Sequence, residues 1–334
     1  MTMSRRSFSK LVGAGLFASS AGLALPAFAQ GKAKRLKVAN FYPSDHAMNR
    51  AIREVFMTTV PEYTNGAYTI SLHDNSSLGS EVQLSEGMRI GTIEIAIIGG
   101  LLGTSSNLPT SLLELPYVFK DYDHVWRVLD GEIGDDLAKE FEKINVKILG
   151  WLANGFRSVT NSVRPIQTLA DTEGIRLRVP ESKVYIETSK ALGFSVVTMP
   201  FGEVFNALSQ KVVDGQENPP STVLTGKWYE VQPYLAVTNH LYSYGAFAMN
   251  MRTWNKLSPA EQEGMLRAAK ETSLLQRRLL EEDAKADIEK LAALGMEVTY
   301  PNLDELREAT AGVRASIAAE YPGGPELLAR IMAA

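Results

Sequence analysis

The sequence predicts a two-lobed α/β protein in which each lobe is a mostly parallel sheet flanked by helices and one long helix spans both lobes. Apolar segments of strand length alternate with helical segments from residue 35 to residue 251, which is typical of parallel pairing with helices on both faces. The chain has 334 residues, more than one hydrophobic core normally serves. The helix predicted for residues 259–294 would extend about 54 Å, beyond the roughly 30 Å diameter of a small domain.

Residues 1–29 are predicted to form a cleavable export signal. Arg5 and Arg6 precede a short apolar segment, and Ala27 and Ala29 supply the small residues that a signal peptidase requires. The apolar segment is shorter than the roughly 20 residues that span a bilayer. The paired arginines predict twin-arginine export to the periplasm, with an ordinary secretion signal as the alternative.

Composition excludes several classes of partner and cofactor. The formal charge is −4, and removal of a signal containing Arg5, Arg6 and Lys10 would make it more negative. An acidic protein of this kind is not expected to bind nucleic acid or an anionic membrane. The chain has no cysteine, so it can form neither disulfides nor thiolate metal sites.

The first lobe is assigned to residues 30–153. Ser80 and Gln83 form a predicted capping box, and Gly91 ends the helix that follows it. Open sheets bind ligands beyond the carboxyl ends of their strands, which here are the loops 40–46 and 99–106. The predicted elements are strands 35–41, 68–73 and 94–98, helices 45–63 and 81–91, and a turn at Asn65-Gly66.

Asp45 and His46 lie where a strand ends and a helix begins. Two interpretations stay open at this point: ligand contact by both residues, or capping of the helix by Asp45. The glycines at positions 99, 100 and 103 predict a loop that lets backbone approach the ligand or the other lobe, without the Gly-Lys-Ser/Thr ending of a phosphate loop.

The second lobe is assigned to residues 154–244, with a return to the first lobe over residues 245–275 and C-terminal helices 276–334 packing on both lobes. The chain is expected to cross between lobes through Gly155. The predicted elements are helices 135–145, 168–171, 181–192 and 202–209, and strands 146–152, 175–179, 195–199, 235–244 and 246–251.

The long helix has the clearest end signals in the sequence. Ser258 is the predicted N-cap, Pro259 the first helical residue and Glu261 the partner of the capping box, while Gly295 lies just past the end. An apolar stripe at steps of three and four residues predicts a face packed on the core, with a coiled-coil dimer as the alternative.

The strand 175–179 carries two arginines. Side chains alternate along a strand, so Arg176 and Arg178 face away from Ile175, Leu177 and Val179. A buried guanidinium needs an anion, so these residues predict either a ligand site or, alternatively, a surface ion pair or a solvated edge.

Five motifs in order resemble the DctP-like family of solute-binding proteins of tripartite ATP-independent periplasmic (TRAP) transporters. They are Asn154-Gly-x-Arg157, Arg164-Pro-Ile, Gly174-Ile-Arg-Leu-Arg178-Val-Pro, Met199-Pro-Phe201 and Asp214-Gly-Gln-Glu-Asn218-Pro. The resemblance implies the periplasmic binding protein fold and a long helix bracing both lobes. It also implies that the chain delivers a ligand to the TRAP membrane subunits.

The resemblance also implies the roles of particular residues. Arg178 would form a two-pronged salt bridge with a ligand carboxylate, and Arg157 and Asn218 would line the same cleft. Phe201 would pack against the ligand. Apart from the resemblance, Arg157 with Asn154 and Asn218 could hold ligand hydroxyls or a second carboxylate. The role of Arg176 stays open.

No catalytic or metal motif is present. The chain has no Gly-x-Ser-x-Gly, no His-Glu-x-x-His and no cysteine nucleophile, and its four histidines lie in separate elements. We therefore expect no metal, no cofactor and no enzymatic activity. The alternatives are a periplasmic enzyme acting on an acidic sugar, with Glu217 or Asp214 as base, and a sensor that uses the same cleft.

The ligand expected from this resemblance is a small carboxylate. A sugar acid, either a uronate or an aldonate, is favoured because the polar groups outnumber those that a bare C4-dicarboxylate would need. A C4-dicarboxylate or another organic acid is the alternative. The protein is expected to be monomeric.

Overall fold

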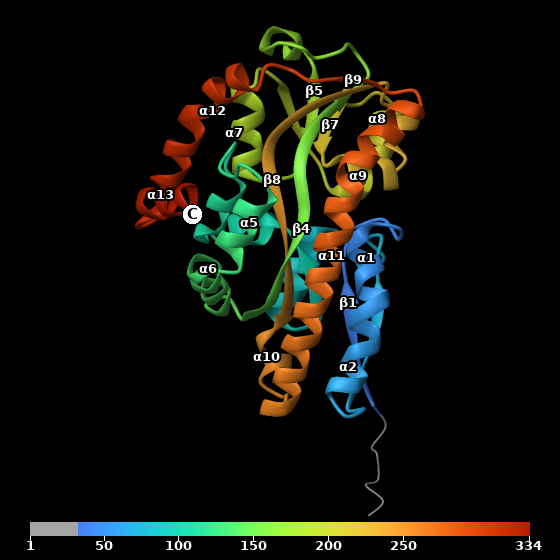
Figure 1. Cartoon of the computed structure of the whole chain (residues 1–334), viewed down its shortest axis with the longest axis vertical. Helices are drawn as coiled ribbons and strands as arrows, with labels where there is room; N and C mark the ends of the chain where they lie inside the picture. Colours follow the sequence, from blue (N-terminus) through green and yellow to red (C-terminus); the bar gives the residue numbers. More distant parts are fainter. Residues whose placement is uncertain (1–32) are drawn as a thin grey trace, which may run out of the picture. The chain divides into compact units, whose positions relative to one another are not determined.

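The computed structural model describes residues 33–334, and the export signal predicted for residues 1–29 lies outside them. A mixed sheet runs through the described residues in the order β2-β1-β3-β8-β4-β7-β5-β6, with β9 beside β8 (Figure 1). Its strands are β1 Lys34–Ala39, β2 Tyr68–His73, β3 Ile95–Ile98, β4 Val146–Asn161, β5 Arg176–Val179, β6 Ser195–Thr198, β7 Gly215–Asn218, β8 Tyr234–Asn250 and β9 Glu297–Thr299.

Helices cover the sheet, and several are short. The α-helices are α1 Ala47–Ala51, α2 Met57–Tyr63, α3 Glu81–Ile90, α4 Gly100–Ser105, α5 Tyr122–Leu129, α6 Glu132–Glu142, α7 Lys183–Ala191, α8 Val204–Ser209, α9 Pro220–Thr225, α10 Met251–Trp254, α11 Pro259–Ala293, α12 Leu303–Ala318 and α13 Gly324–Ala333. A π-helical turn, η1 Ile52–Phe56, joins α1 to α2, and the 3₁₀ turns are η2 Pro109–Glu114, η3 Leu169–Thr172, η4 Phe201–Glu203 and η5 Trp228–Glu230.

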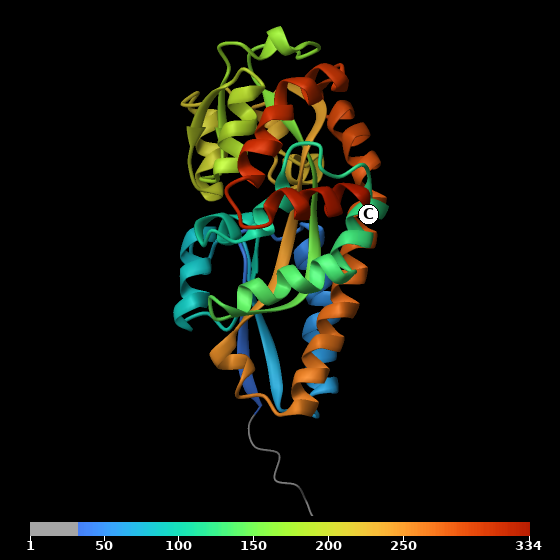
Figure 2. The ribbon, with the colours of Figure 1, turned by 90° about the vertical axis from the view of Figure 1, so that its left-hand side faces the viewer.

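The two-lobed α/β prediction is confirmed, and the structure adds an antiparallel strand pair that joins the two lobes. Parallel pairing joins β1 to β2 and β3 in the first lobe, and β5 to β6 and β7 in the second. The antiparallel pair of β4 and β8 connects these two groups into one sheet. Both strands run through the centre of the molecule from one lobe to the other (Figure 2).

The lengths predicted for these two central strands were wrong. Strand 146–152 continues to Asn161 as part of β4, and the two strands predicted for 235–251 form the single strand β8. The β4–β8 register shifts in three places, including one between Ala153 and Gly155. Such bulges bend a strand without ending its pairing, and Gly155 accepts the required φ of 118°.

The long helix was predicted correctly. Ser258 and Glu261 form the capping box of α11, and Gly295 follows its end at φ 100°. The helix packs on α1, η1 and α2 in the first lobe and on α9 in the second, so it spans both. Since its apolar face is covered by its own chain at Leu280 and Leu291, that face serves as core.

The start predicted for the helix over residues 45–63 was wrong. It begins at Ala47, and its N-cap is His46, whose Nδ1 accepts a hydrogen bond from the Met48 N–H at 3.2 Å. Asp45 therefore does not cap it. The predicted glycine loop 99–106 is also wrong in part, because Gly100–Ser105 form the helix α4.

The remaining local signals were confirmed within a few residues. Ser80 and Gln83 form the capping box of α3, and Gly91 ends it in the left-handed conformation. The helix predicted for 135–145 begins earlier, at Glu132, and ends at Glu142.

The hydrophobic core of the first lobe is assembled from distant parts of the chain. Val38, Ile52 and Ile97 lie in it together with Phe247 from β8 and Ala268 from α11. The N-terminal half of the chain thus depends on residues supplied much later in the sequence.

Candidate ligand-binding cleft

A cleft lies between the lobes, where β4 and β8 cross from one to the other. The first lobe contributes the carboxyl ends of β1 and β3, as the open-sheet rule predicts. Five of the seven site residues predicted from the sequence line this cleft. They are Arg178, Arg157, Asn154, Asn218 and Phe201.

Arg178 lies on β5, and its side chain is buried although it carries a charge. Its Nε and Nη2 donate to the Met199 carbonyl oxygen at 3.0 and 2.6 Å. Among residues 33–334, no aspartate or glutamate forms an ion pair with it. Burial lowers the pKa of Arg178 to about 10, so the guanidinium is still charged at neutral pH. A buried cation in this state favours an anion as its partner.

Arg157 on β4 is also buried, but the fold neutralises it. Its Nη2 donates to Glu217 Oε1 at 2.8 Å, and its Nε donates to Oε2 of the same carboxylate. His240 Nε2 lies 3.4 Å from Glu217 Oε2. Burial is the largest single influence on Arg157 and lowers its pKa, but Glu217, Tyr185 and Glu114 together outweigh burial and raise the pKa of Arg157 overall.

Arg176 occupies a different environment on the same strand. Its side chain is 47% exposed, and its Nη2 and Nε donate to Asp214 at 2.7 and 2.9 Å. The outer end of β5 therefore carries an ordinary surface ion pair, which is the alternative that the sequence left open for these arginines.

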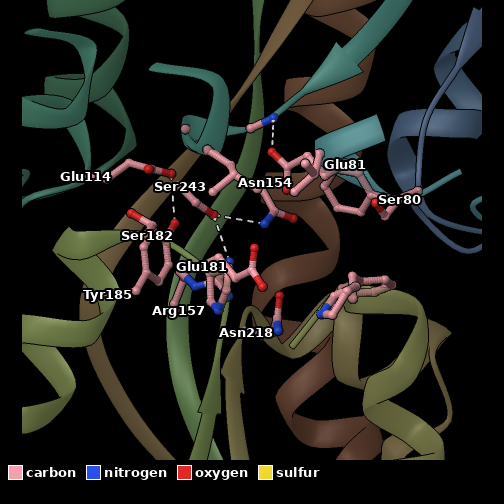
Figure 3. Close-up of a pocket in the computed structure, with 18 of the residues that line it drawn as sticks. Ser80, Glu81, Glu114, Asn154, Arg157, Glu181, Ser182, Tyr185, Asn218 and Ser243 are labelled. Atoms are coloured by element: carbon pink, nitrogen blue, oxygen red, sulfur yellow. Dashed lines mark hydrogen bonds between the residues drawn. The ribbon is translucent and has the colours of Figure 1, made fainter. Parts of the chain in front are cut away.

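Two asparagines and a serine provide neutral polar groups in the cleft. Asn154 Nδ2 donates to Ser243 Oγ at 2.8 Å, and Ser243 Oγ also accepts from Arg157 Nη1 at 3.2 Å (Figure 3). Asn218 Nδ2 donates to Gln216 Oε1 at 2.8 Å. Side chains of this kind can bind hydroxyl groups, because they offer both donors and acceptors.

An apolar wall closes one side of the cleft. The rings of Phe201 and Phe41 lie 5.4 Å apart between centroids, and Phe41 stacks on Tyr42 at 4.3 Å. Phe41 follows β1 in the first lobe, whereas Phe201 belongs to the second, so the wall is built from both. It can pack against the carbon skeleton of a ligand.

Two glutamates in the cleft, the buried Glu114 and the partly buried Glu81, were missed by sequence reasoning. Glu81 accepts a hydrogen bond from the Gly99 N–H at 2.8 Å, and Glu114 accepts one from the Tyr185 hydroxyl at 2.7 Å (Figure 3). Burial raises the pKa of Glu81 to about 7 and that of Glu114 to about 8. Glu81 looked like an ordinary first-turn acid, and no local signal distinguishes Glu114.

Asp45 and His46 do not lie in this cleft. They line a separate cavity beside α11, together with Arg50 and Asp287. His46 is fully buried and stacks on Tyr42 at 4.7 Å, which leaves its ring one residue layer behind the cleft wall. Burial lowers the pKa of His46 to about 4, so its imidazole is neutral at physiological pH.

In the described part of the chain, no three histidine, aspartate or glutamate side chains are grouped so that they could hold a metal ion. Over the same residues, no helix has the length and apolar character needed to cross a membrane.

The fold and the cleft between its lobes define the class of this protein, which is a two-lobed solute-binding protein. Residues 38–320 match the family model described as bacterial extracellular solute-binding protein, family 7. The chain belongs to this family, and the resemblance to TRAP solute-binding proteins is confirmed.

Individual relatives support the same assignment. The chain is 33% identical over 276 residues to the 2,3-diketo-L-gulonate-binding periplasmic protein YiaO of Escherichia coli, covering 82% of this chain and 84% of that protein. A TRAP periplasmic solute-binding protein from Haemophilus influenzae with bound L-gulonate has a TM-score of 0.86 and 32% identity, covering 89% and 98% of the two chains. A Sulfitobacter protein with bound β-D-galacturonate has a TM-score of 0.86 and 29% identity, covering 90% and 100%.

Proposed function

We propose that this protein captures a sugar acid, either an aldonate or a uronate, in the periplasm and delivers it to TRAP membrane subunits. The observation that carries the proposal is Arg178, a buried cation that faces the cleft without a carboxylate partner among the described residues. The planar guanidinium can pair with both oxygens of a carboxylate. The relatives with bound L-gulonate and galacturonate support this choice of ligand.

The rest of the cleft favours a hydroxylated ligand. Asn154, Asn218 and Ser243 offer hydrogen-bonding groups to hydroxyls, and Phe201 offers an apolar surface to a carbon skeleton. Arg157 is already paired with Glu217, so Arg178 is the arginine that remains for a ligand carboxylate. This arrangement supports one carboxylate and several hydroxyls rather than a C4-dicarboxylate.

The proposed assignments extend to the organisation of the chain. Residues 30–153 with 245–275 form the first lobe, residues 154–244 the second, and residues 276–334 pack on both. The protein acts as a monomer and not as an enzyme. The two acids considered as catalytic bases support the absence of enzymatic activity, since Glu217 is paired with Arg157 and Asp214 is paired with Arg176.

A thermal-shift screen tests the proposal directly. Aldonates and uronates such as L-gulonate and D-galacturonate should raise the unfolding temperature, because a ligand at 100 times its Kd adds about 2.7 kcal/mol of stability. Succinate and malate serve as matched dicarboxylate controls. The proposal would be wrong if the dicarboxylates stabilised the protein more than every sugar acid in the screen.

A further inference from the structure

Glu114 ends the 3₁₀ turn η2 and lies on the wall of the cleft. Its side chain is buried, and its Oε1 accepts a hydrogen bond from the Tyr185 hydroxyl at 2.7 Å. The other oxygen, Oε2, is buried without a hydrogen-bond partner among residues 33–334. A buried polar atom in this position costs free energy unless it has a hydrogen-bond partner, which a ligand can supply.

The structure reserves space for this oxygen. A Cβ atom on Gly100 would lie 1.6 Å from Glu114 Oε2, so no other residue at position 100 would leave the carboxyl group in place. Gly100 begins α4 and also lines the cleft. The close approach explains a glycine that helix propensity alone disfavours.

The charges around the cleft determine which state of Glu114 is compatible with an anionic ligand. Glu81, Glu114 and Glu217 would outnumber Arg157 and Arg178 if all were ionised, and an organic anion would then enter a negative site. The titratable groups that face Glu114 come from the elements packed around it. They are Tyr42 after β1, Glu81 on α3, Arg157 on β4, Tyr185 on α7, Glu217 on β7 and Tyr244 on β8.

We propose that Glu114 binds the ligand as a neutral carboxylic acid, donating a hydrogen bond from its protonated Oε2 to a ligand oxygen. Glu114 then selects ligands that carry an acceptor at its end of the cleft, which lies across from Glu81 in Figure 3. This inference rests on the proposed function. The Tyr185 hydroxyl donates to Oε1, so the proton belongs on Oε2 and no proton transfer accompanies binding.

The pKa of Glu114 supports a protonated carboxyl group at this position. Burial raises the pKa of Glu114 to about 8, so the acid is mostly neutral at pH 7 before any ligand enters. Tyr185 opposes the shift, because its hydrogen bond stabilises the carboxylate. A ligand anion nearby would favour the neutral form further.

The protonation state can be measured without ligand. Carbon-13 NMR of protein labelled at glutamate Cδ, with Glu114→Gln to identify the resonance, should show Glu114 titrating near pH 8. Tyr185→Phe should move that titration to higher pH, since it removes the hydrogen bond that stabilises the carboxylate. A Glu114 resonance that is fully ionised throughout pH 5–9 would overturn the proposal.

Calorimetric titration with L-gulonate and with D-galacturonate at pH 6–9 tests the contact with ligand. In the native protein, affinity should fall by about tenfold per pH unit above the pKa of Glu114. Glu114→Gln keeps a donor at this position, so it should retain affinity at pH 7 and remove this fall. Glu81→Gln is the matched control, and its affinity should still fall as the pH rises.

Two results would overturn the role of Glu114. The first is a fall in affinity with pH that is the same in Glu114→Gln as in the native protein. The second is a loss of ligand affinity in Glu114→Gln of more than about a hundredfold at every pH. Such a loss would mean that the ligand requires an ionised acceptor at this position. If neither sugar acid binds the native protein, the proposed function fails instead, and the NMR titration still decides the state of Glu114.

Discussion

Two buried arginines in the same cleft have different surroundings. Arg157 on β4 is held by the Glu217 carboxylate and by the Ser243 hydroxyl, whereas Arg178 on β5 contacts a backbone carbonyl and, among the described residues, no carboxylate. Burial alone therefore does not identify a ligand-binding arginine. The distinction lies in whether the fold supplies the counter-charge, and this comparison separates a structural arginine from one that remains for a ligand.

The largest expected effect concerns the neutralised arginine. Glu217→Gln would leave Arg157 buried without its counter-charge, so the free energy of unfolding should fall by about 3–5 kcal/mol. Urea denaturation measures the change, and Arg178→Met is the matched comparison. We expect a smaller loss for Arg178→Met, below about 3 kcal/mol, since it leaves only the Met199 carbonyl without its donor. Equal losses in both variants would remove the distinction between the two arginines.

Ligand affinity, in contrast to stability, should depend most strongly on Arg178. Arg178→Ala should weaken the binding of a sugar acid by about 2–5 kcal/mol, because the buried ligand carboxylate loses its partner. This corresponds to about 30-fold to several-thousand-fold in Kd. Arg178→Lys keeps the charge but not the planar pair of donors, and it should lose a substantial part of the affinity. Calorimetry, with circular dichroism to establish folding, measures both; near-native affinity of Arg178→Ala would contradict the assignment.

Two cleft acids with raised pKa values give the stability of the ligand-free protein a distinctive pH dependence. Glu81 and Glu114 have raised pKa values, about 7 and about 8, so the folded state holds protons that the unfolded state releases. Stability should therefore fall as the pH rises from about 5 to 8, with each group contributing at most about 1.4 kcal/mol per pH unit.

Glu217 should affect the pH dependence of stability with the opposite sign. The pKa of Glu217 is lowered, because Arg157 and His240 outweigh the effect of burial, and its contribution should disappear only in acid. Thermal unfolding between pH 3 and pH 8 separates the two effects. Glu114→Gln should flatten the decline above pH 5, and a native protein that is more stable at pH 8 than at pH 5 would contradict this account.

The smallest effect is expected at Arg176. Its ion pair with Asp214 is exposed to solvent and lies at the outer end of β5. Arg176→Ala should change ligand affinity and stability by less than about 1 kcal/mol each. The same calorimetric titrations serve as the test, and a loss larger than that of Arg178→Ala would show that the two positions had been assigned in reverse.

Local signals in the sequence predicted local features well. The capping boxes at Ser80 and Ser258 involve residues only three positions apart, so their interaction is visible in the sequence itself. Alternation along β5 put Arg176 and Arg178 on one face, but it could not show that Arg178 is buried while Arg176 is exposed. The family motifs then placed Asn154, Arg157, Asn218 and Phe201 in one cleft.

Features that depend on distant partners could not be predicted in this way. The continuity of β4 and β8 rests on pairing with bulges, which interrupts the alternation of apolar residues. Glu217 lies 60 residues from Arg157, and only the sheet brings them together. His46, in contrast, was misjudged because its imidazole replaces the Asp45 carboxylate as the helix cap, which residue preferences do not favour.

The shared core of the first lobe has a consequence for biosynthesis. Val38 and Ile97 reach their final packing only when Phe247 and Ala268 are available, and a ribosome must translate about four-fifths of the chain before it has made these residues. The first lobe cannot mature as the nascent chain emerges, because β3 lacks its neighbour β8 until that stage. Contacts between such distant residues slow folding and leave unpaired strand edges exposed in the meantime. The order in which the chain is translated therefore differs from the order in which this protein becomes stable.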